Sequence, residues 1–188
     1  MTAKNTISPP TCVGLLRGIN VGGKHILPMK QLAEFFTQEN CGNVRTYIQS
    51  GNVVFSASPA TLAKLADRIS KRIEQRFGFP SPLILRRPEE IAQVVRDNPF
   101  LHAGLPEKTL HVYFLAGEPS TDAVKNLDPD RSAPDAYHVR GREIYLYLPN
   151  GMARTKLTSA YFDSKLSTVC TARNWATVLK LLEMTQAS

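Results

Sequence analysis

Residues 43–57 read NVRTYIQSGNVVFSA, and this stretch has the pattern of two β-strands joined by a tight turn. β-Branched and aromatic residues, which are enriched in strands, recur on both sides of Ser50-Gly51. Glycine adopts the positive φ angles that short hairpin turns require. The stretch therefore predicts a β-hairpin with a two-residue turn at Ser50-Gly51.

Outward from this hairpin, the pattern changes to helix and then to strand in both directions. Pro28 begins an apolar helical repeat over residues 28–40, and Ser58-Pro59 opens a second one that ends at Gly78. The outermost segments, residues 11–17 and 82–87, are continuous apolar runs typical of buried strands. The first half of the chain thus has the order βαββαβ.

The same order recurs in the second half. A helix at residues 88–97 leads to a segment rich in proline and glycine at 98–108, which we interpret as a linker. The patterns then predict a strand at 109–116, a helix at 120–127, strands at 136–140 and 143–149, a helix at 157–166 and a strand at 168–172. Asn174 is placed to cap a closing helix whose apolar residues face a core.

Two consecutive βαββαβ units correspond to the ferredoxin-like plan. The sequence therefore predicts an α+β fold made of two ferredoxin-like (α/β-plait) subdomains with an additional C-terminal helix. We place the subdomains at residues 1–97 and 98–188, with 98–108 as the linker between them. No sequence repeat accompanies this duplication of element order.

Composition limits the classes of protein to which the chain can belong. With 188 residues, 43% of them hydrophobic, the chain can bury a core. Its three cysteines, Cys12, Cys41 and Cys170, are too few and too scattered for a disulfide framework. No segment resembles a secretory signal or a membrane span. We therefore expect a soluble cytoplasmic protein with no membrane partner.

The net charge of +7 is concentrated in windows without acidic residues, at 1–33, 40–66 and 144–162. Uncompensated positive charge of this kind favours an anionic partner. The alternative is that the basic character only keeps the protein soluble.

Residues 17–25, RGINVGGKH, match a phosphate-binding loop only in part. The pattern Gly-x-x-x-x-Gly-Lys runs from Gly18 to Lys24, but His25 stands where that loop needs Ser or Thr, and Pro28 delays the helix. These differences argue against a nucleotide triphosphatase. Two interpretations stay open: an anion-binding nest formed by Gly18, Gly22 and Gly23 beside Arg17 and Lys24, or a tight connection that needs glycine.

Aromatic side chains recur on the two strands expected at the centre of the second unit. Alternation places His111 and Tyr113 on one face of the first strand, and Tyr145 and Tyr147 on one face of the second. Aromatics on adjacent central strands stack bases in RNA-recognition domains, but the signature motif of those domains is absent here. We therefore prefer packing between the units as the role of this tyrosine face.

Two basic segments follow near the C-terminus. RTKL (154–157) supplies Arg154 and Lys156, and TARNW (171–175) supplies Arg173 just before a capped helix, where anions are favoured. An ordinary surface cluster is the alternative.

The sequence gives no sign of metal or triad chemistry. The histidines and cysteines form no recognisable ligand set, and QSGN (49–52) is not a nucleophile elbow. We expect no cofactor and no metal.

Several motifs, in this order, resemble the bacterial domain-of-unknown-function family 1697: LLRGINVGGKHILPM, NVRTYIQSGNVVF, NPF, VYFL and TARNWATVLKLL. The resemblance covers residues 12 to 183 and implies a tandem of ferredoxin-like subdomains, without implying a particular activity. Positions that recur in the family correspond here to Arg17, Gly18, Asn20, Gly22, Gly23, Tyr47, Gln49, Ser50, Gly51, Asn52, Arg154, Lys156, Arg173, Asn174 and Trp175. His25 and Ala176 depart from the usual residues of the family.

We hypothesise that the protein is a binding module for an anionic ligand, either nucleic acid or a phosphorylated small molecule. The alternative is an enzyme acting on a phosphorylated or carboxylated metabolite between the subdomains, with Tyr47 or His25 carrying the proton. A third hypothesis is an interaction protein whose aromatic face binds a partner, and the oligomeric state stays open. The candidate ligand-binding residues are Arg17, Gly18, Asn20, Gly22, Gly23, Lys24, Gln49, Ser50, Asn52, Arg154, Lys156 and Arg173.

Overall fold

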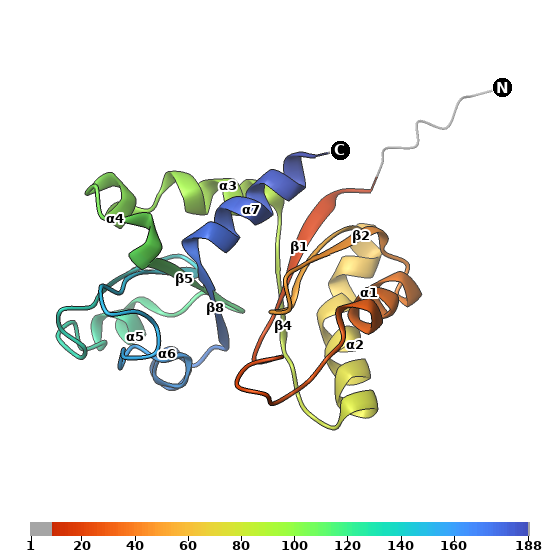
Figure 1. The fold of residues 1–188 in the computed structure, drawn as a ribbon, viewed down its shortest axis with the longest axis horizontal. Coiled ribbons are helices and arrows are strands. Elements are labelled where there is room, and N and C mark those ends of the chain that lie inside the picture. The colour runs from red at the N-terminus through yellow and green to blue at the C-terminus, as the bar shows by residue number, and fades with distance from the viewer. Residues whose placement is uncertain (1–8, 188) are drawn as a thin grey trace.

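The computed structural model describes residues 9–187 and shows two four-stranded antiparallel sheets with several helices (Figure 1). The first half contains β1 (Thr11–Leu16), α1 (Met29–Gln38), β2 (Gly42–Tyr47), β3 (Asn52–Ser56), α2 (Pro59–Phe77) and β4 (Leu83–Arg86). The connecting elements are α3 (Pro88–Arg96), α4 (Pro99–His102) and the 3-10 helix η1 (Glu107–Thr109). The second half contains β5 (Leu110–Leu115), α5 (Thr121–Lys125), β6 (Ala136–Arg140), β7 (Glu143–Tyr147), α6 (Ser159–Leu166), β8 (Cys170–Asn174) and α7 (Trp175–Gln186).

The strand orders are β2-β3-β1-β4 and β6-β7-β5-β8, so the two sheets have the same arrangement. This mixed α+β architecture is consistent with the two tandem α/β subdomains that the sequence predicts. The first eight residues of the predicted first subdomain lie outside the described residues. Within residues 9–187, none of the helices combines the length and apolar character that a bilayer crossing requires.

Local signals place the helix ends. The Ser58 side chain accepts a hydrogen bond from the Thr61 N–H at 3.2 Å, and Gly78 ends α2 with a left-handed φ of 76°. The Asn174 side chain caps α7 by accepting from the Thr177 N–H at 2.8 Å. These predicted caps are confirmed.

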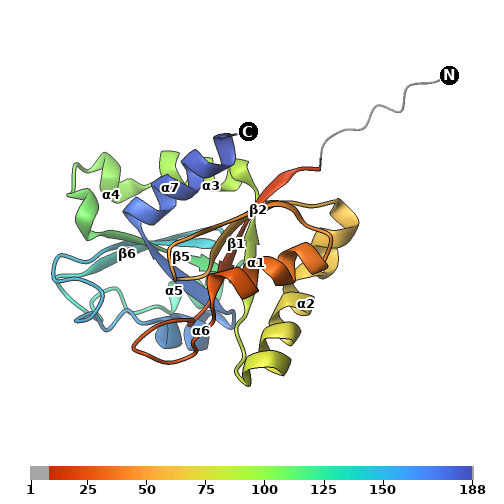
Figure 2. The ribbon, with the colours of Figure 1, turned by 45° about the vertical axis from the view of Figure 1, so that its right-hand side comes forward.

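Each sheet has one face covered by its own helices, and the opposite faces share a core. α1 and α2 cover the first sheet, and α5 and α6 cover the second (Figure 1). The shared core contains Val13 and Leu15 of β1 together with Val112 and Phe114 of β5. α3 and α7 pack against each other and contribute to the same core, and both views show them side by side (Figure 2). The two halves are therefore joined by apolar packing across both sheets.

The predicted two-residue hairpin turn is wrong. Tyr47 pairs with Asn52, so the turn comprises the four residues 48–51, with Ile48 at φ 46°. Gly51 has φ 75°, and a Cβ there would lie 2.7 Å from the Leu16 Cβ. Glycine is needed at this position both for its backbone conformation and for close packing on β1.

The segment predicted as a linker, residues 98–108, is largely structured. The Asn98 side chain caps α4 by accepting from the N–H groups of Phe100 and Leu101. Phe100 and Leu101 pack against the shared core. The segment connects the two halves as a packed element because its apolar side chains are partly buried against this core, which its proline and glycine content does not reveal.

The predicted tyrosine face does not exist. Tyr113 lies opposite Ile144 and Tyr145 lies opposite Val112, so the two tyrosines point to opposite faces of the second sheet. Tyr113 packs beneath α6 against Phe162, whereas Tyr145 is buried in the shared core. Tyr147 lies beside Phe100. The packing between the units that we preferred is therefore found for Tyr145, whereas Tyr113 packs within the second half.

Candidate functional site

Two buried arginines occupy equivalent positions in the two sheets. β4 and β8 are edge strands, and each pairs with the first strand of its own half. Arg86 lies opposite Val13, and Arg173 lies opposite Val112, which is the corresponding residue of β5. Each guanidinium reaches across to the other half of the chain.

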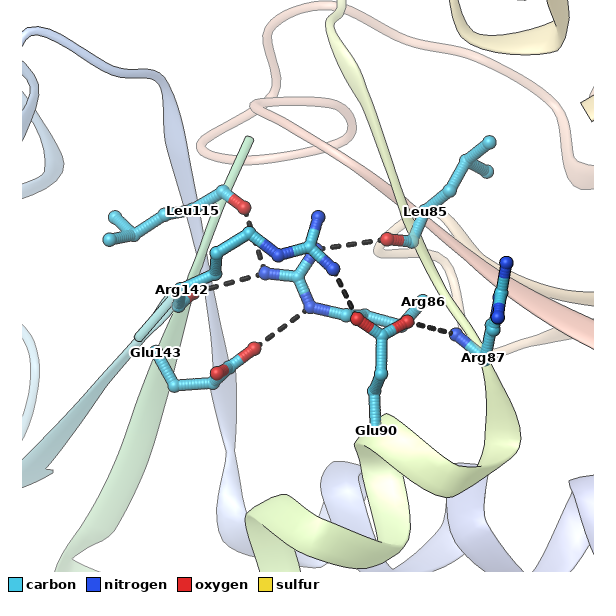
Figure 3. A network of polar contacts seen from close by, with 7 residues as sticks. All are labelled: Leu85, Arg86, Arg87, Glu90, Leu115, Arg142 and Glu143. Carbon is cyan, nitrogen blue, oxygen red and sulfur yellow. Dashed lines mark hydrogen bonds and ion pairs between the residues drawn. The ribbon is translucent and has the colours of Figure 1, made fainter. Parts of the chain in front are cut away.

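Arg86 is fully buried and is held by β5 and β7 (Figure 3). Its Nε donates to Glu143 Oε1 at 2.9 Å, and its Nη2 donates to the carbonyls of Leu115 and Arg142 at 2.8 and 3.0 Å. Burial lowers the pKa of Arg86 and raises the pKa of Glu143, although each partner's charge opposes the shift in the other. Arg86 is therefore a buried charge with a carboxylate partner.

Next to this pair, Arg142 forms an ion pair with Glu90 of α3 (Figure 3). The second carboxylate oxygen of Glu90 accepts from the Arg87 N–H at 2.7 Å. The network thus ties the start of α3 to the turn before β7.

Arg173 repeats the geometry of Arg86 in the opposite direction. Its Nε donates to Asn52 Oδ1 at 2.5 Å, and its Nη2 donates to the carbonyls of Leu16 and Ser50 at 2.8 and 3.1 Å. By strand register, Leu16 corresponds to Leu115, and Asn52 corresponds to Glu143. The duplication therefore extends from element order to individual contacts.

The two arginines differ in the charge of the partner. Arg173 donates only to neutral acceptors, because Asn52 stands where Arg86 has Glu143. Burial lowers the pKa of Arg173 to about 10, which still leaves the guanidinium charged near neutral pH. Within the described part of the chain, its positive charge has no carboxylate partner.

An amide is required at position 52 because it must accept and donate at once. Oδ1 of Asn52 accepts from Arg173, while Nδ2 donates to the Tyr47 carbonyl at 3.1 Å and to Ser50 Oγ at 2.9 Å. An ionised carboxylate cannot donate. Asn52 therefore holds Arg173 and the hairpin turn together without neutralising the charge.

A cavity of 360 Å³ lies beside Arg173 between the two halves. Its lining comes from the end of β1, the loop of residues 17–28 (the glycine loop), the hairpin turn, β5, α6 and β8. It includes the polar side chains of Arg17, Ser50, Ser159, Thr171 and Arg173. No aspartate or glutamate is among the described residues that line it. The cavity is thus lined by two arginines and by no acid.

Arg17 is one of the residues that line this cavity. It forms an ion pair with Asp163 of α6, and both side chains are partly exposed. The other carboxylate oxygen of Asp163 accepts from the Cys170 N–H at 2.9 Å. Arg17 therefore ties the glycine loop of the first half to a helix of the second.

Two residues at the start of the glycine loop, Gly18 and Ile19, line the cavity. Gly18 has φ 70°, and in the described part of the chain the N–H groups of Gly18 and Ile19 have no hydrogen-bond acceptor. His25 holds the loop: its Nδ1 lies 3.0 Å from the Gly18 carbonyl, and its ring stacks on Phe79 at 4.5 Å. Unpaired donors beside a positive φ form the kind of concavity that binds anions.

The structure brings four of the predicted site residues to the cavity, namely Arg17, Gly18, Ser50 and Arg173. The sequence predicts Arg173 at the start of α7, where an anion could contact it, but in the structure its side chain is buried. Its N–H groups donate to six protein acceptors. It sets the charge of the cavity and positions its walls, and it is not free to contact a ligand.

The remaining predicted residues lie near the cavity or away from it. Asn52 supports the wall, and Asn20 ties the glycine loop to the hairpin by donating to the carbonyls of Leu27 and Gln49 at 2.9 and 2.7 Å. The residues that do not line the cavity and are exposed are Gly22, Gly23, Lys24, Gln49, Arg154 and Lys156.

Sequence reasoning missed Tyr113, Met152 and Ser159, which also line the cavity, and the pairing of Arg17 with Asp163. It also missed the buried ion pair of Arg86 with Glu143. The one available signal was that the last strand of each half carries an arginine near its end, in PLILRR and TARN. Among the described residues, histidine, cysteine, aspartate and glutamate form no group of three or more that could hold a metal ion.

Comparison with known proteins places this architecture in a family. No curated protein matches the chain. Among solved structures, the chain is similar to the conserved bacterial protein SP0830 from Streptococcus pneumoniae, with 21% identity over 93% of this chain and 98% of that one, and a TM-score of 0.70. At this identity the likeness shows a shared fold alone. The family described as "Protein of unknown function (DUF1697)" matches residues 10–145, well over half of the sequence, so the chain belongs to that family, as its motifs predict.

Proposed function

We propose that this protein binds an anionic ligand in the cavity between its two halves. The observation that carries the proposal is the charge of the lining. Among the described residues, no aspartate or glutamate lines the cavity, Asp163 touches it only through its ion pair with Arg17, and the buried Arg173 has only neutral partners. A charge in a poorly solvated site acts over a longer range than one in water. The cavity is therefore suited to a negative group.

Arg86 provides an internal comparison. The same guanidinium geometry occurs there with Glu143 as partner, so its charge is compensated within the protein. At Arg173, no described residue of the protein supplies a compensating negative charge. We infer that a bound anion supplies it, with direct contacts from Arg17, from the N–H groups of Gly18 and Ile19, and from the hydroxyls of Ser50 and Ser159.

The size of the cavity favours a small molecule over nucleic acid. A volume of 360 Å³ is at the lower end of the range of roughly 300–1,000 Å³ that is typical of small-molecule pockets. The exposed cations Lys24, Arg154 and Lys156 lie outside the lining. Their role in the proposal is to raise the local concentration of anions.

Binding is better supported than catalysis. Burial raises the pKa values of Tyr113 and Cys170, which line the cavity, so both are neutral near pH 7. The amides of the candidate residues Asn20 and Asn52 are bonded to backbone carbonyls. His25 is stacked on Phe79. These contacts favour a binding module over the alternative of an enzyme.

We further infer that each half is a ferredoxin-like subdomain. Support comes from the βαββαβ order and from antiparallel sheets in which the first and third strands are central. We keep the division at residues 97/98, since α4 begins the connection to β5.

Two substitutions should change anion affinity in opposite directions. Arg17→Gln removes a contact, and we expect the dissociation constant for phenyl phosphate to rise about tenfold, since hydrogen bonds to charged groups contribute about 1.5–3 kcal/mol. Asp163→Asn keeps the acceptor for the Cys170 N–H but frees Arg17. We expect it to lower the dissociation constant about threefold. Isothermal titration calorimetry measures both.

Lys64→Gln is the matched control, because Lys64 is an exposed cation on α2 that does not line the cavity. The affinity of this variant for phenyl phosphate should equal that of the protein without substitutions. If both test variants weaken binding equally, the effect reflects damage to the interface between the halves, and the proposed role of Arg17 is wrong.

A further inference from the structure

The exposed apolar side chains of this protein gather beside the proposed anion site. Among residues 9–187, the large hydrophobic residues with the greatest exposure are Val21, Ile26 and Ile48, at 66%, 59% and 50%. Val21 and Ile26 belong to the glycine loop, and Ile48 belongs to the hairpin turn. The Asn20 side chain joins these two loops through the Gln49 carbonyl. Exposed apolar side chains that lie close together often mark binding surfaces.

One of these residues also lines the cavity. Val21 is part of the wall, together with Met152 and Tyr113 from the second half. Met152 is half-buried, and its sulfur lies 3.8 Å from the Tyr113 hydroxyl. The cavity therefore has apolar walls from both halves in addition to its arginines, and a ligand seated in it would cover Val21.

We propose that the ligand is a phosphate monoester with a compact apolar group, an inference that rests on the proposed function. Its phosphate lies by Arg17 and the N–H groups of Gly18 and Ile19, and its apolar group covers Val21 and Met152. A monoester fits because it has a negative end with several acceptor oxygens and one organic substituent. The volume of 360 Å³ accommodates a phosphate together with a substituent at least as large as a phenyl ring.

A series of phosphates tests this assignment on the full chain. Inorganic phosphate, methyl phosphate, butyl phosphate and phenyl phosphate differ in apolar area while they keep the anionic group. We expect affinity, measured by isothermal titration calorimetry, to rise at least tenfold from methyl to phenyl phosphate, since burial of apolar surface is favourable.

Val21→Ser and Ile26→Ser form a matched pair, since both residues are exposed on the same loop but only Val21 lines the cavity. We expect Val21→Ser to lower the affinity for phenyl phosphate about threefold to tenfold and to leave the affinity for methyl phosphate unchanged. Ile26→Ser should leave both affinities unchanged. Equal affinity for all four phosphates, or an equal loss in the two variants, would overturn the apolar assignment and leave anion binding intact. Failure of every phosphate to bind would contradict the proposed function itself.

Discussion

Replacing Arg173 with methionine is expected to lower the free energy of unfolding by about 3–5 kcal/mol. Methionine fills much of the volume but donates no hydrogen bond, so the Asn52 amide oxygen and the half-buried Ser50 carbonyl lose their donor, while the Leu16 carbonyl keeps only the Thr171 hydroxyl. Each buried acceptor left unpaired costs about 1–3 kcal/mol. Urea denaturation followed by circular dichroism measures the loss.

Arg154→Met is the control for this substitution, because Arg154 is an exposed arginine of the second half. It should change the free energy of unfolding by less than about 0.5 kcal/mol. Arg173→Lys should recover little, since a single ammonium cannot reach acceptors that surround a planar guanidinium. A loss below about 1 kcal/mol for Arg173→Met would show that the two halves do not depend on this contact.

Replacing Arg86 with methionine is expected to cost a similar amount, about 3–5 kcal/mol, for a different reason. Arg86 is the charge partner of Glu143, whose side chain is only 17% exposed, so the substitution leaves a carboxylate largely buried and unpaired. Adding Glu143→Gln should then recover about 1–2 kcal/mol by removing that charge. The same urea titration of both single variants and the double variant gives the coupling between the two residues.

The contrast between the two arginines is itself informative. Arg86 has a charged partner whose neutralisation rescues its loss, whereas Arg173 has only neutral partners and therefore no equivalent rescue. Failure of Glu143→Gln to recover any stability in the Arg86→Met background would mean that the lost carbonyl contacts, and not the stranded carboxylate, account for the cost.

Local patterns in the sequence predict the elements well because short-range chemistry sets their ends. Ser58, Gly78 and Asn174 act within a few residues of their own positions, so the boundaries of α2 and α7 follow from them. Element order then predicts the two-part architecture.

Features that depend on strand register or on packing between the sheets could not be predicted from local patterns. The faces on which Tyr113 and Tyr145 lie follow from the pairing of β5 with β7, which one strand alone does not reveal. The burial of Arg173 depends on how the first sheet packs against the second, and its position before a helix suggested an exposed cation instead.

The residues of the candidate site fall into the same two groups, those that local patterns identify and those that depend on the assembled structure. Arg17, Gly18 and Ser50 were found because glycine and polar residues stand out beside apolar strands. Met152 and Ser159 come from the other half of the chain and reach the cavity only through the assembled interface. They carry no pattern of their own in the sequence.

Anion binding in this cavity is tested most directly by a titration of the labelled full chain with phenyl phosphate, followed by proton–nitrogen NMR. We predict saturable shifts of the backbone amides of Gly18 and Ile19 and of the Arg17 Nε–H, all with one dissociation constant, because these three residues line the cavity and the two amides have no acceptor among the described residues. The Lys64 amide on α2 should not shift. Saturable shifts confined to Arg154 and Lys156, with Gly18 and Ile19 unchanged, would contradict the cavity as the anion site.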